Sequence, residues 1–430
     1  MLKKTKVSRH GARISEQKIG NFSLYKEIKT PFYRRLYLCS LPVLFYRNRV
    51  LPTSCKNCFK RVEEWALALN TYTQCSKKSL LLWVDHSLGG GTENYSFAQF
   101  KQLQSKYTVV RLQYFTEYDC FIISTPNNEV GAACFLTLQA LPSFPQLAEI
   151  VVNNLVGYKD TLAVLKLVVS LKQQQPSLKV SYRGHDYQAI CPSFNLLNCE
   201  GEFCNLSHPK GCAYCSQAIT FDPVLRSGFT DISSWRSSWQ DFFTNTVDEM
   251  IVFSDSVKSL FCRMYPVLET KICVVPHKSR NYPVVKIPPH KGINIGILGN
   301  ISSVPKGYKL LAELCQHLTQ SDVRLIVIGN YKNPPARLKV LGKYKPNDLP
   351  AIIQSQKIDL IFIPSIVPET FSYTTAEAIS MGLPVACYRL GAPGERVAAY
   401  KKGLILEKID PATNLTTMVE FIKHLQHKEA

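Results

Sequence analysis

The chain has 430 residues, 46% of them hydrophobic, and a formal net charge of +19. This hydrophobic content excludes a disordered chain, and the length predicts two or three domains that bury their own cores without disulfide or metal staples. The 15 cysteines are scattered and odd in number, which is typical of a reducing compartment. No apolar stretch follows the basic start, so we expect no secretory signal and a cytoplasmic location.

Residues 1–78 are predicted to be a basic N-terminal extension. Residues 1–80 contain 17 Lys and Arg but only 4 Asp and Glu. Such an excess indicates an anionic partner, either nucleic acid or an anionic membrane face, or else a solvated basic surface. The apolar run 36–46 (LYLCSLPVLFY) would rise about 16 Å as a helix, too little to span a membrane core of about 30 Å. It is either a segment in the membrane interface or an ordinary buried segment.

A first α/β domain is predicted over residues 79–280. The expected strands are 80–85, 107–112, 120–124, 149–154, 178–183 and 250–254. The expected helices are one ending near 104, then 159–173, 232–244 and 256–264. This order of strand, Gly-rich turn, helix and strand indicates a parallel sheet with right-handed crossovers. The irregular region 187–230, rich in Cys, Pro, Asn and Ser, is interpreted as an insertion or lid.

A second α/β domain is predicted over residues 281–430, after a Pro- and Lys-rich linker at 276–292. The expected strands are 293–298, 324–328, 359–363 and 384–388. The expected helices are 306–318, 349–356, 373–381 and 411–427, and the last is a candidate to return to the first domain. In doubly wound sheets ligands bind at the carboxyl ends of the strands, which would place a site in the cleft between the two domains.

The strongest motif lies where a predicted strand ends and a helix opens near Ser372 or Tyr373. Within PETFSYTTAEA, Glu369 falls in the loop and Glu377 in the first turns of the helix, and GLPV follows at 382–385. The free backbone N–H groups of a helix start, here at Phe371, Ser372 and Tyr373, can hold a phosphate. The Glu377 carboxylate can accept hydrogen bonds from both hydroxyls of a ribose, and Glu369 can reach hydroxyls of a sugar.

This segment closely resembles the family 4 retaining glycosyltransferases of GT-B fold, whose signature is two glutamates separated by seven residues in the same setting. The resemblance covers roughly residues 79–410 and is sharpest over 293–397. In that family the first glutamate contacts the transferred sugar and the second the ribose, which maps to Glu369 and Glu377. The resemblance implies a nucleotide-sugar co-substrate, retention at the anomeric carbon and no cofactor or catalytic metal. The sequence also contains no Asp-x-Asp, the usual metal-diphosphate motif of single-domain transferases.

Two more positions of the second domain match this family. Gly299 and Asn300 end its first predicted strand, and Lys306 opens the next helix. The family usually has a basic residue soon after that glycine and a Lys-Gly at the helix start, and these cations neutralise the donor diphosphate. Lys306 matches, whereas Asn300 stands near the expected arginine, so Lys343 is a candidate for the missing charge. The alternative for Lys306 is a solvated surface lysine.

Two predicted strand ends of the first domain are further candidates. The triplet Gly89, Gly90 and Gly91 resembles the family's glycine-rich loop, where a ligand can approach the backbone closely, although a flexible turn is the alternative. His185 and Asp186 follow another strand, and the family commonly has a histidine there, near the donor sugar. We therefore expect His185 to hydrogen-bond or polarise the sugar and Asp186 to orient it or contact the acceptor. The alternative for this pair is a structural turn.

A cysteine cluster lies in the irregular region. Cys191, Cys204, Cys212 and Cys215 have the spacing C-x12-C-x7-C-x2-C, and Cys199 could replace Cys191. The last pair has zinc-knuckle spacing, and four thiolates would suit a structural Zn²⁺. Free thiols or a reducible pair are the alternatives. The surrounding sequence resembles a branch of the same transferases that carries a cysteine-containing insertion after a His-Asp-Tyr motif.

Together these features predict a GT-B enzyme of the α/β class, with two doubly wound Rossmann-like domains facing across a cleft. We expect it to transfer a hexose-type sugar from a nucleotide-sugar to a glycan or lipid-linked glycan acceptor, with retention, in cell-surface polysaccharide synthesis. Its place would be cytoplasmic, peripheral on the inner membrane face, with no nucleic-acid partner. The alternatives are a nucleotide-sugar epimerase or hydrolase of the same fold, and an inactive transferase-fold binding protein. Strongly salt-dependent nucleic-acid binding would favour the last.

Overall fold

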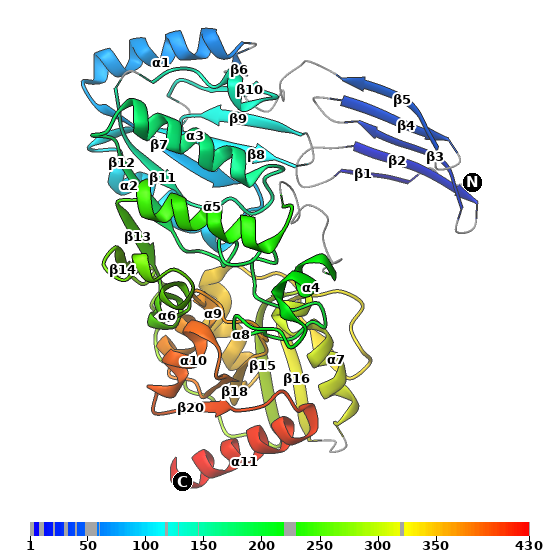
Figure 1. Cartoon of the computed structure of the whole chain (residues 1–430). Helices are drawn as coiled ribbons and strands as arrows, with labels where there is room; N and C mark the ends of the chain where they lie inside the picture. Colours follow the sequence, from blue (N-terminus) through cyan, green and yellow to red (C-terminus); the bar gives the residue numbers. More distant parts are fainter. Residues whose placement is uncertain are drawn as a thin grey trace. The chain divides into compact units, whose positions relative to one another are not determined.

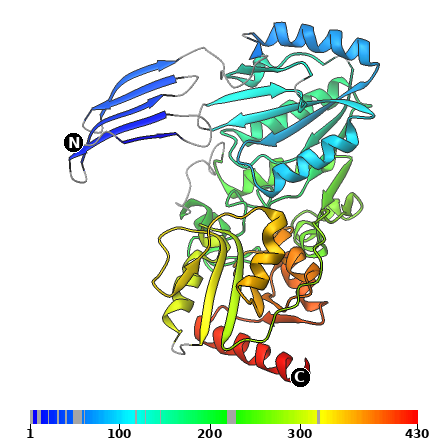
Figure 2. The ribbon, with the colours of Figure 1, turned by 180° about the vertical axis from the view of Figure 1, so that it is seen from behind.

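The computed structural model describes five strands between residues 4 and 47, strand residues 58–59, and residues 61–429 apart from 117–118, 128, 145, 219–228 and 319–321 (Figures 1 and 2). Side chains are described within residues 61–427. The chain divides into two compact units, residues 1–182 with 223–228, and residues 183–222 with 229–430. No helix among the described residues is long and apolar enough to cross a membrane.

The predicted N-terminal extension contains an antiparallel sheet. Its strands follow chain order: β1 (Lys4–Val7), β2 (Arg13–Ile19), β3 (Phe22–Lys29), β4 (Tyr33–Leu38) and β5 (Leu41–Arg47). The apolar run 36–46 is divided between β4 and β5, with Leu36 opposite Leu44, so it is a hairpin and not a helix. Its side chains, and residues 39–40 themselves, lie outside the described residues, and its role in the membrane interface stays a prediction.

A nine-stranded sheet follows, in the order β14-β13-β12-β11-β7-β8-β9-β10-β6. Its strands are β6 (Cys58–Phe59), β7 (Ser79–His86), β8 (Tyr107–Phe115), β9 (Cys120–Ser124), β10 (Ala132–Phe135), β11 (Leu147–Val152), β12 (Lys179–Arg183), β13 (Glu249–Val252) and β14 (Ile272–Val274). The pairs β12-β11, β11-β7 and β7-β8 are parallel as predicted, and β13 also pairs in parallel with β14, a strand that was not predicted. The pairs β8-β9 and β9-β10 are antiparallel, so this edge departs from a purely parallel sheet. The boundary between the two units falls within β12.

The helices that accompany this sheet are α1 (Val62–Ser76), α2 (Gly91–Leu103), α3 (Thr161–Gln174), α5 (Ile232–Asn245) and α6 (Asp255–Met264). The α3 helix begins where Asp160 accepts a hydrogen bond from the Ala163 N–H, a normal N-cap. In α1, Trp65 is fully buried and its indole N–H donates to the Gly131 carbonyl. The α1 helix and β6 therefore belong with this sheet, although they precede residue 79, where the domain was predicted to begin.

The second domain is a six-stranded parallel sheet in the order β17-β16-β15-β18-β19-β20. Its strands are β15 (Ile293–Ile301), β16 (Val323–Tyr331), β17 (Leu338–Val340), β18 (Leu360–Ile363), β19 (Val385–Tyr388) and β20 (Gly403–Leu406). Its helices are α7 (Tyr308–Gln316), α8 (Leu349–Ser355), α9 (Tyr373–Ser380), α10 (Gly391–Ala398) and α11 (Pro411–Glu429). The predicted strands and helices are present, and β17, β20 and α10 were not predicted.

Alternate residues of β16 face two separate cores, as expected for a doubly wound sheet. Val327 packs in one core with residues of α7 and α11, and Ile326 in the other with residues of α8 and α9. Met418 of α11 is fully buried in the first of these cores. The last helix thus packs on the sheet of its own domain, and its return to the first domain stays a prediction.

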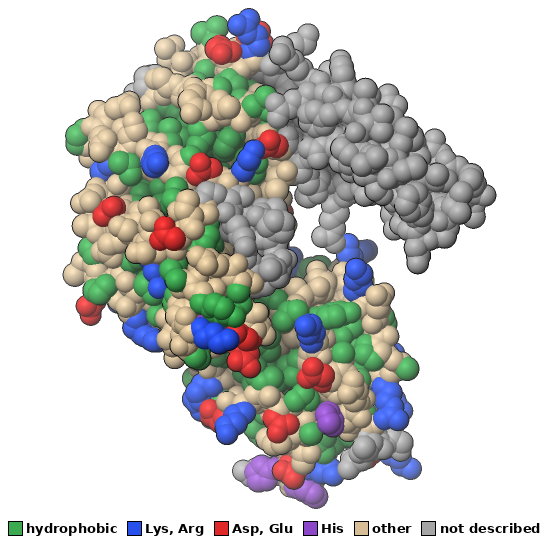
Figure 3. Space-filling view, turned by 45° about the vertical axis from the view of Figure 1, so that its right-hand side comes forward, with side chains coloured by type: hydrophobic (Ala, Val, Ile, Leu, Met, Phe, Trp, Pro, Cys, Tyr) green, Lys and Arg blue, Asp and Glu red, His purple; other side chains and the backbone are tan. Residues whose placement is uncertain are grey.

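Residues 187–218 are irregular, as predicted, apart from the short helix α4 (Gly211–Ala218). Four residues in this region that are not glycine have positive φ: Phe194, Leu196, Asn205 and Leu206. Side chains with a Cβ rarely adopt this conformation, so the region holds backbone strain. On the face shown in Figure 3, basic and acidic side chains are interspersed over the described parts of the chain.

Candidate functional site

The loop between β18 and α9 ends in a well-formed helix cap. The Ser372 hydroxyl accepts a hydrogen bond from the Thr375 hydroxyl at 2.9 Å and lies 3.5 Å from the Thr375 amide. Both residues are buried. This cap fixes the first turn of α9, while the amides that precede the first intrahelical bond keep no partner within the helix. The helix start on which the phosphate prediction depends is therefore present, with Ser372 as its cap.

Lys306 and Glu369 form an ion pair at this loop. The Lys306 Nζ lies 2.8 Å from the Glu369 Oε1, and Glu369 is 10% exposed. The contact depends on Gly307, which has a φ of +79°, because a Cβ at this position would lie 2.2 Å from the Pro364 carbonyl oxygen. Only a glycine lets the turn that carries Lys306 approach the end of β18 this closely. The structure thus brings together two residues that the sequence analysis assigned to one ligand.

The backbone of Glu369 is held from its other side by α10. The Ala392 amide donates to the Glu369 carbonyl at 2.9 Å. Gly391 has a φ of +56°, and a Cβ there would lie 2.5 Å from the same carbonyl oxygen. Glu369 therefore has a fixed main chain, and its carboxylate can change partners without movement of the loop.

Glu377 lies one turn farther along α9 and is partly buried. Burial raises the pKa of its carboxyl group, while the charge of Arg280 opposes this shift. Tyr344 is close enough that burial and the Glu377 charge together raise the pKa of its hydroxyl to about 12. A partly buried carboxylate gains most from a ligand that donates hydrogen bonds to it. Glu377 lies next to the helix start, where its carboxylate can accept hydrogen bonds from two neighbouring hydroxyl groups of one ligand.

Several aromatic and imidazole rings pack next to the helix cap at Ser372. Phe371 stacks on His277 with ring centroids 4.6 Å apart, and the Arg396 guanidinium lies 4.0 Å from the Phe371 centroid. The His277 Nδ1 is 2.8 Å from the Tyr373 hydroxyl. Burial, with the charge of Arg396 in addition, lowers the pKa of His277 to about 3, so the ring is neutral at pH 7. These contacts hold Phe371 and Tyr373, the residues on either side of Ser372.

His185 joins this stack from the loop after β12. Its ring lies 4.5 Å from that of Phe253 and 5.3 Å from that of His277, and its carbonyl accepts a hydrogen bond from the Thr370 hydroxyl at 2.9 Å. The structure therefore places His185 beside the loop of Glu369, and its contact with a donor sugar stays a prediction. The Asp186 carboxylate accepts a hydrogen bond from the Gln188 amide at 2.7 Å, which gives it a structural role in the turn.

Gly299 and Asn300 lie within β15, which continues to Ile301, so the prediction that they end the strand is wrong. Gly299 has a φ of +104°, and a Cβ there would lie 3.6 Å from the Thr374 methyl group at the start of α9. Asn300 is exposed. Gly299 is thus next to the helix start, and a larger residue would narrow the space there.

In the first unit, α2 begins at Gly91 after Gly89 and Gly90, which have φ values of +78° and +86°. At Gly90 the positive φ alone favours glycine, because a Cβ there would meet nothing within 4 Å. The end of β7 is fixed by the buried pair of Asp85 and Arg111 at 3.0 Å. The triplet is therefore a defined helix start and not a flexible turn.

The four cysteines predicted to bind zinc do not form one group. Among the described residues, Cys199, His208 and Cys215 have ligand atoms within 4.8 Å of one another, and Cys191, Cys204 and Cys212 are not in this group. The Cys212 sulfur instead accepts a contact from Arg236 at 3.6 Å.

Sequence reasoning missed His277, Thr370 and Arg396. His277 lies in the Pro- and Lys-rich segment that was interpreted as a linker, and Arg396 lies in α10, whose GAPGER sequence lacks a helical pattern. Thr370 stands inside the predicted motif, between two residues that were assigned roles. No local signal identifies its partner, which is 185 positions away.

Residues 292–424, within the second α/β domain, match the family model described as glycosyl transferases group 1. Among curated proteins, none matches the sequence.

The solved structures that are similar to the chain include the following three. Sucrose-phosphate synthase from Thermosynechococcus elongatus is 12% identical over 80% of this chain and 91% of that one, with a TM-score of 0.52. HepE of Anabaena, in complex with UDP-glucose, is 14% identical over 81% and 91%, with a TM-score of 0.48. WaaG, a glycosyltransferase involved in lipopolysaccharide biosynthesis, is 12% identical over 80% and 90%, with a TM-score of 0.47. The first likeness shows the fold: two Rossmann-like domains of the GT-B type.

Proposed function

We propose that the chain is a retaining glycosyltransferase that takes a hexose-type sugar from a nucleotide-sugar donor. The observation that carries the proposal is the Lys306–Glu369 pair beside the capped start of α9, with Glu377 one turn away, all inside a group 1 domain. A cation, the backbone amides of a helix start and a partly buried carboxylate match the diphosphate and ribose of such a donor. The donor is a co-substrate, and catalysis in this proposal uses no metal or cofactor.

In the proposed reaction, the donor diphosphate draws Lys306 away from Glu369. The Lys306 ammonium and the α9 amides then stabilise the charge that grows on the leaving nucleoside diphosphate. Glu369, released from the lysine, accepts hydrogen bonds from hydroxyls of the sugar. His185 lies beside this loop and contacts the sugar while positive charge develops on the anomeric carbon. The acceptor hydroxyl attacks the anomeric carbon from the face that the diphosphate leaves, which gives retention, and its proton passes to the departing phosphate oxygen. Gly89–Gly91 would contact the donor from the first domain, and Asp186 the acceptor.

The ring stack supports the chemistry indirectly. His277 is neutral at pH 7 because burial lowers its pKa, and it therefore adds no charge that would repel the developing oxocarbenium ion. Its contacts with Phe371 and Tyr373 hold the residues on both sides of Ser372. We assign His277 a positioning role.

The acceptor in this proposal is a glycan or a lipid-linked glycan, and the pathway is cell-surface polysaccharide synthesis. The basic residues of the first 80 positions support a place on the anionic cytoplasmic face of a membrane. Flotation with anionic vesicles tests this place, with the full chain compared to a chain that starts at residue 58 and therefore keeps β6 and α1. Equal partitioning of the two would contradict it.

Calorimetry with UDP, GDP, ADP and their common sugar conjugates tests the donor site. We expect tight binding of one nucleotide, and a weakening of about tenfold or more in Glu377→Ala, since a hydrogen bond to a charged group contributes about 1.5–3 kcal/mol. Glu313→Ala, which removes an exposed glutamate of α7 in the same domain, is the matched control and should bind like wild type.

Two outcomes would overturn the proposal. A folded protein that binds none of the nucleotides would favour an inactive transferase fold whose function lies in the basic N-terminus. Binding followed by donor turnover without any acceptor would favour an epimerase or hydrolase of the same fold.

A further inference from the structure

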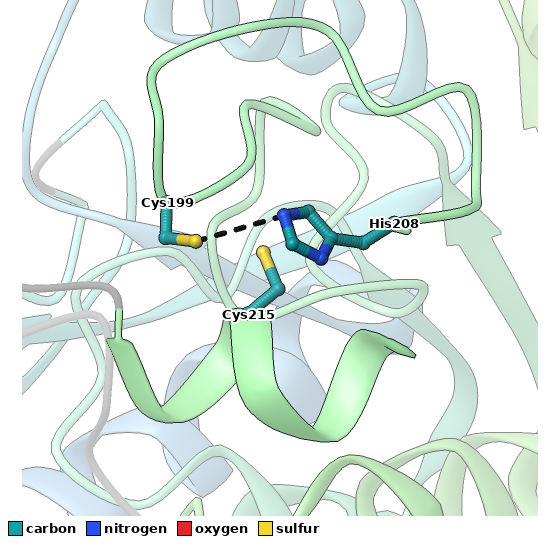
Figure 4. A group of neighbouring side chains, drawn as sticks. All are labelled: Cys199, His208 and Cys215. Atoms are coloured by element: carbon teal, nitrogen blue, oxygen red, sulfur yellow. Dashed lines mark hydrogen bonds between the residues drawn. The ribbon is translucent and has the colours of Figure 1, made fainter. Parts of the chain in front are cut away.

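The irregular region after His185 contains a compact group of metal-ligand side chains. Figure 4 shows Cys199 and His208 on loops and Cys215 on α4, with their side chains directed toward one another. The three ligand atoms all lie within 4.8 Å of one another. His208 has only 4% of its side chain exposed, and Cys215 is 7% exposed. Three segments that are separated in sequence thus bring two sulfur atoms and one imidazole nitrogen close together in a largely buried position.

The spacing of the atoms fits a tetrahedral ion. Zinc bonds of about 2.3 Å to sulfur and about 2.0–2.1 Å to nitrogen place the ligand atoms of a tetrahedron about 3.5–3.8 Å apart. The Cys199 Sγ and the His208 Nε2 are 3.8 Å apart. A thiolate pair with an imidazole favours Zn²⁺ over the hard cations Mg²⁺ and Ca²⁺.

Glu200 is placed to supply the fourth ligand. Its Oε2 lies 2.8 Å from the His208 Nε2 and 3.2 Å from the Cys199 Sγ, so the carboxylate already touches two of the three ligands. Its side chain is 48% exposed, which leaves it free to turn toward a bound ion. Cys212, the partner of Cys215 in the sequence motif, is held by Arg236 instead.

The structure around this group explains how a bound ion would stabilise the fold. Residues 188–190 are anchored to α5 and to the end of α6 by Trp235, Arg236 and Tyr265, whose side chains donate to their carbonyls. Residues 199–215 reach the same helices through polar contacts, including that of Arg263 with the Asn205 side chain at 2.9 Å. Asn205 and Leu206 have positive φ, and Cys215 is the one buried hydrophobic residue of 199–215, so this segment is strained and contributes little to an apolar core.

We propose that Cys199, His208 and Cys215 bind one structural Zn²⁺, with Glu200 as the fourth ligand, and that the ion ties residues 199–208 to α4. Binding releases one proton from each thiol as two Zn–S bonds form. Without the ion, the Nδ1 of His208 accepts a hydrogen bond from the Lys210 amide, so Nε2 carries the ring proton. When Nε2 binds zinc, the ring proton moves to Nδ1, which then no longer accepts the hydrogen bond from the Lys210 amide. This ligand set differs from the four cysteines that the sequence spacing suggests, and it is independent of the proposed catalytic activity.

Metal analysis of the purified full-length chain tests the proposal. We expect about one zinc per chain in wild type, as in other closed structural sites, and loss of nearly all of it in Cys215→Ser and in His208→Ala. The matched control is Cys212→Ser, which removes the other thiol of the C-x2-C pair and should keep its zinc. A wild-type chain that contains no zinc and takes up none from added ZnCl₂ would overturn the proposal. Loss of zinc in Cys212→Ser would overturn this ligand set.

Cobalt substitution tests the same set without any mutation. Co²⁺ in place of Zn²⁺ gives a sulfur-to-metal charge-transfer band whose intensity scales with the number of thiolate bonds. We expect the intensity of two thiolates and the visible bands of a tetrahedral site. The intensity of three or four thiolates, or an octahedral spectrum, would contradict the proposal even if the ligand variants do not fold.

Discussion

The Thr370 hydroxyl donates a hydrogen bond of 2.9 Å to the carbonyl oxygen of His185. Thr370 follows Glu369 directly, so this bond, together with the ring contacts through His277, links two residues that were assigned to the same sugar. His185 and Glu369 come from different sheets, and no helix or strand joins them. We therefore expect loss of this bond to lower activity and to leave nucleotide binding unchanged.

Thr370→Val should lower kcat and leave the affinity for the nucleotide unchanged. The variant removes the hydrogen bond at nearly constant volume, and loss of about 1.4 kcal/mol of transition-state positioning corresponds to about a tenfold slower reaction. Steady-state transfer kinetics and nucleotide calorimetry measure the two effects. The control is Thr417→Val on α11, whose hydroxyl also donates to a backbone carbonyl. A kcat that matches that of the control would contradict a positioning role for the bond.

The sequence predicts best where a contact is local in the chain. Leu81 to Val84 are buried and form a strand because a continuous apolar run of that length needs cover on both faces. The cap at Ser372 and the position of Glu377 follow from the same local pattern. The residues that the analysis missed act over long distances, as His277 does against Phe371. The zinc ligands show the same limit, because spacing pairs Cys212 with Cys215 whereas the fold directs their side chains to different neighbours.

Lys306→Ala should weaken binding of the nucleoside diphosphate by about 10–100-fold, since a charge-assisted hydrogen bond to phosphate contributes about 1.5–3 kcal/mol. Binding of the nucleoside alone should hardly change, because the lysine is expected to contact phosphate and not the ribose. Calorimetry with both ligands measures the difference. Lys309→Ala removes an exposed lysine of α7, one turn away, and is the control for net charge. Equal losses in the two variants would mean that Lys306 is only a surface lysine.

Gly307→Ala should destabilise the second domain far more than Gly342→Ala. Both glycines have a φ near +80°, but a Cβ at 307 would lie 2.2 Å from the Pro364 carbonyl, whereas one at 342 meets nothing within 4 Å. The control therefore reports the backbone strain alone, about 1 kcal/mol, and Gly307→Ala adds a steric overlap that brings the loss to about 2–4 kcal/mol. Thermal unfolding measures both. Similar melting temperatures for the two variants would show that the turn at 307 can move away from β18.

His277 should make the protein less stable at acidic pH. Its folded-state pKa is lowered from 6.5 to about 3, so the unfolded chain binds a proton that the folded chain does not. This histidine therefore adds no pH dependence above pH 6.5, and stability falls as the pH drops from 6.5 toward 3. The upper limit is about 1.4 kcal/mol per pH unit, which gives a loss of about 2 kcal/mol at pH 5.

Other groups also titrate in this range, so the difference between wild type and His277→Phe is the informative quantity. Denaturant unfolding at pH 7, 6 and 5 should give a smaller decrease for His277→Phe, whereas the control His424→Gln, on the exposed face of α11, should follow wild type. Parallel curves for wild type and His277→Phe would mean that His277 accepts a proton without cost in the folded chain, and the ring stack on Phe371 would then carry a charge.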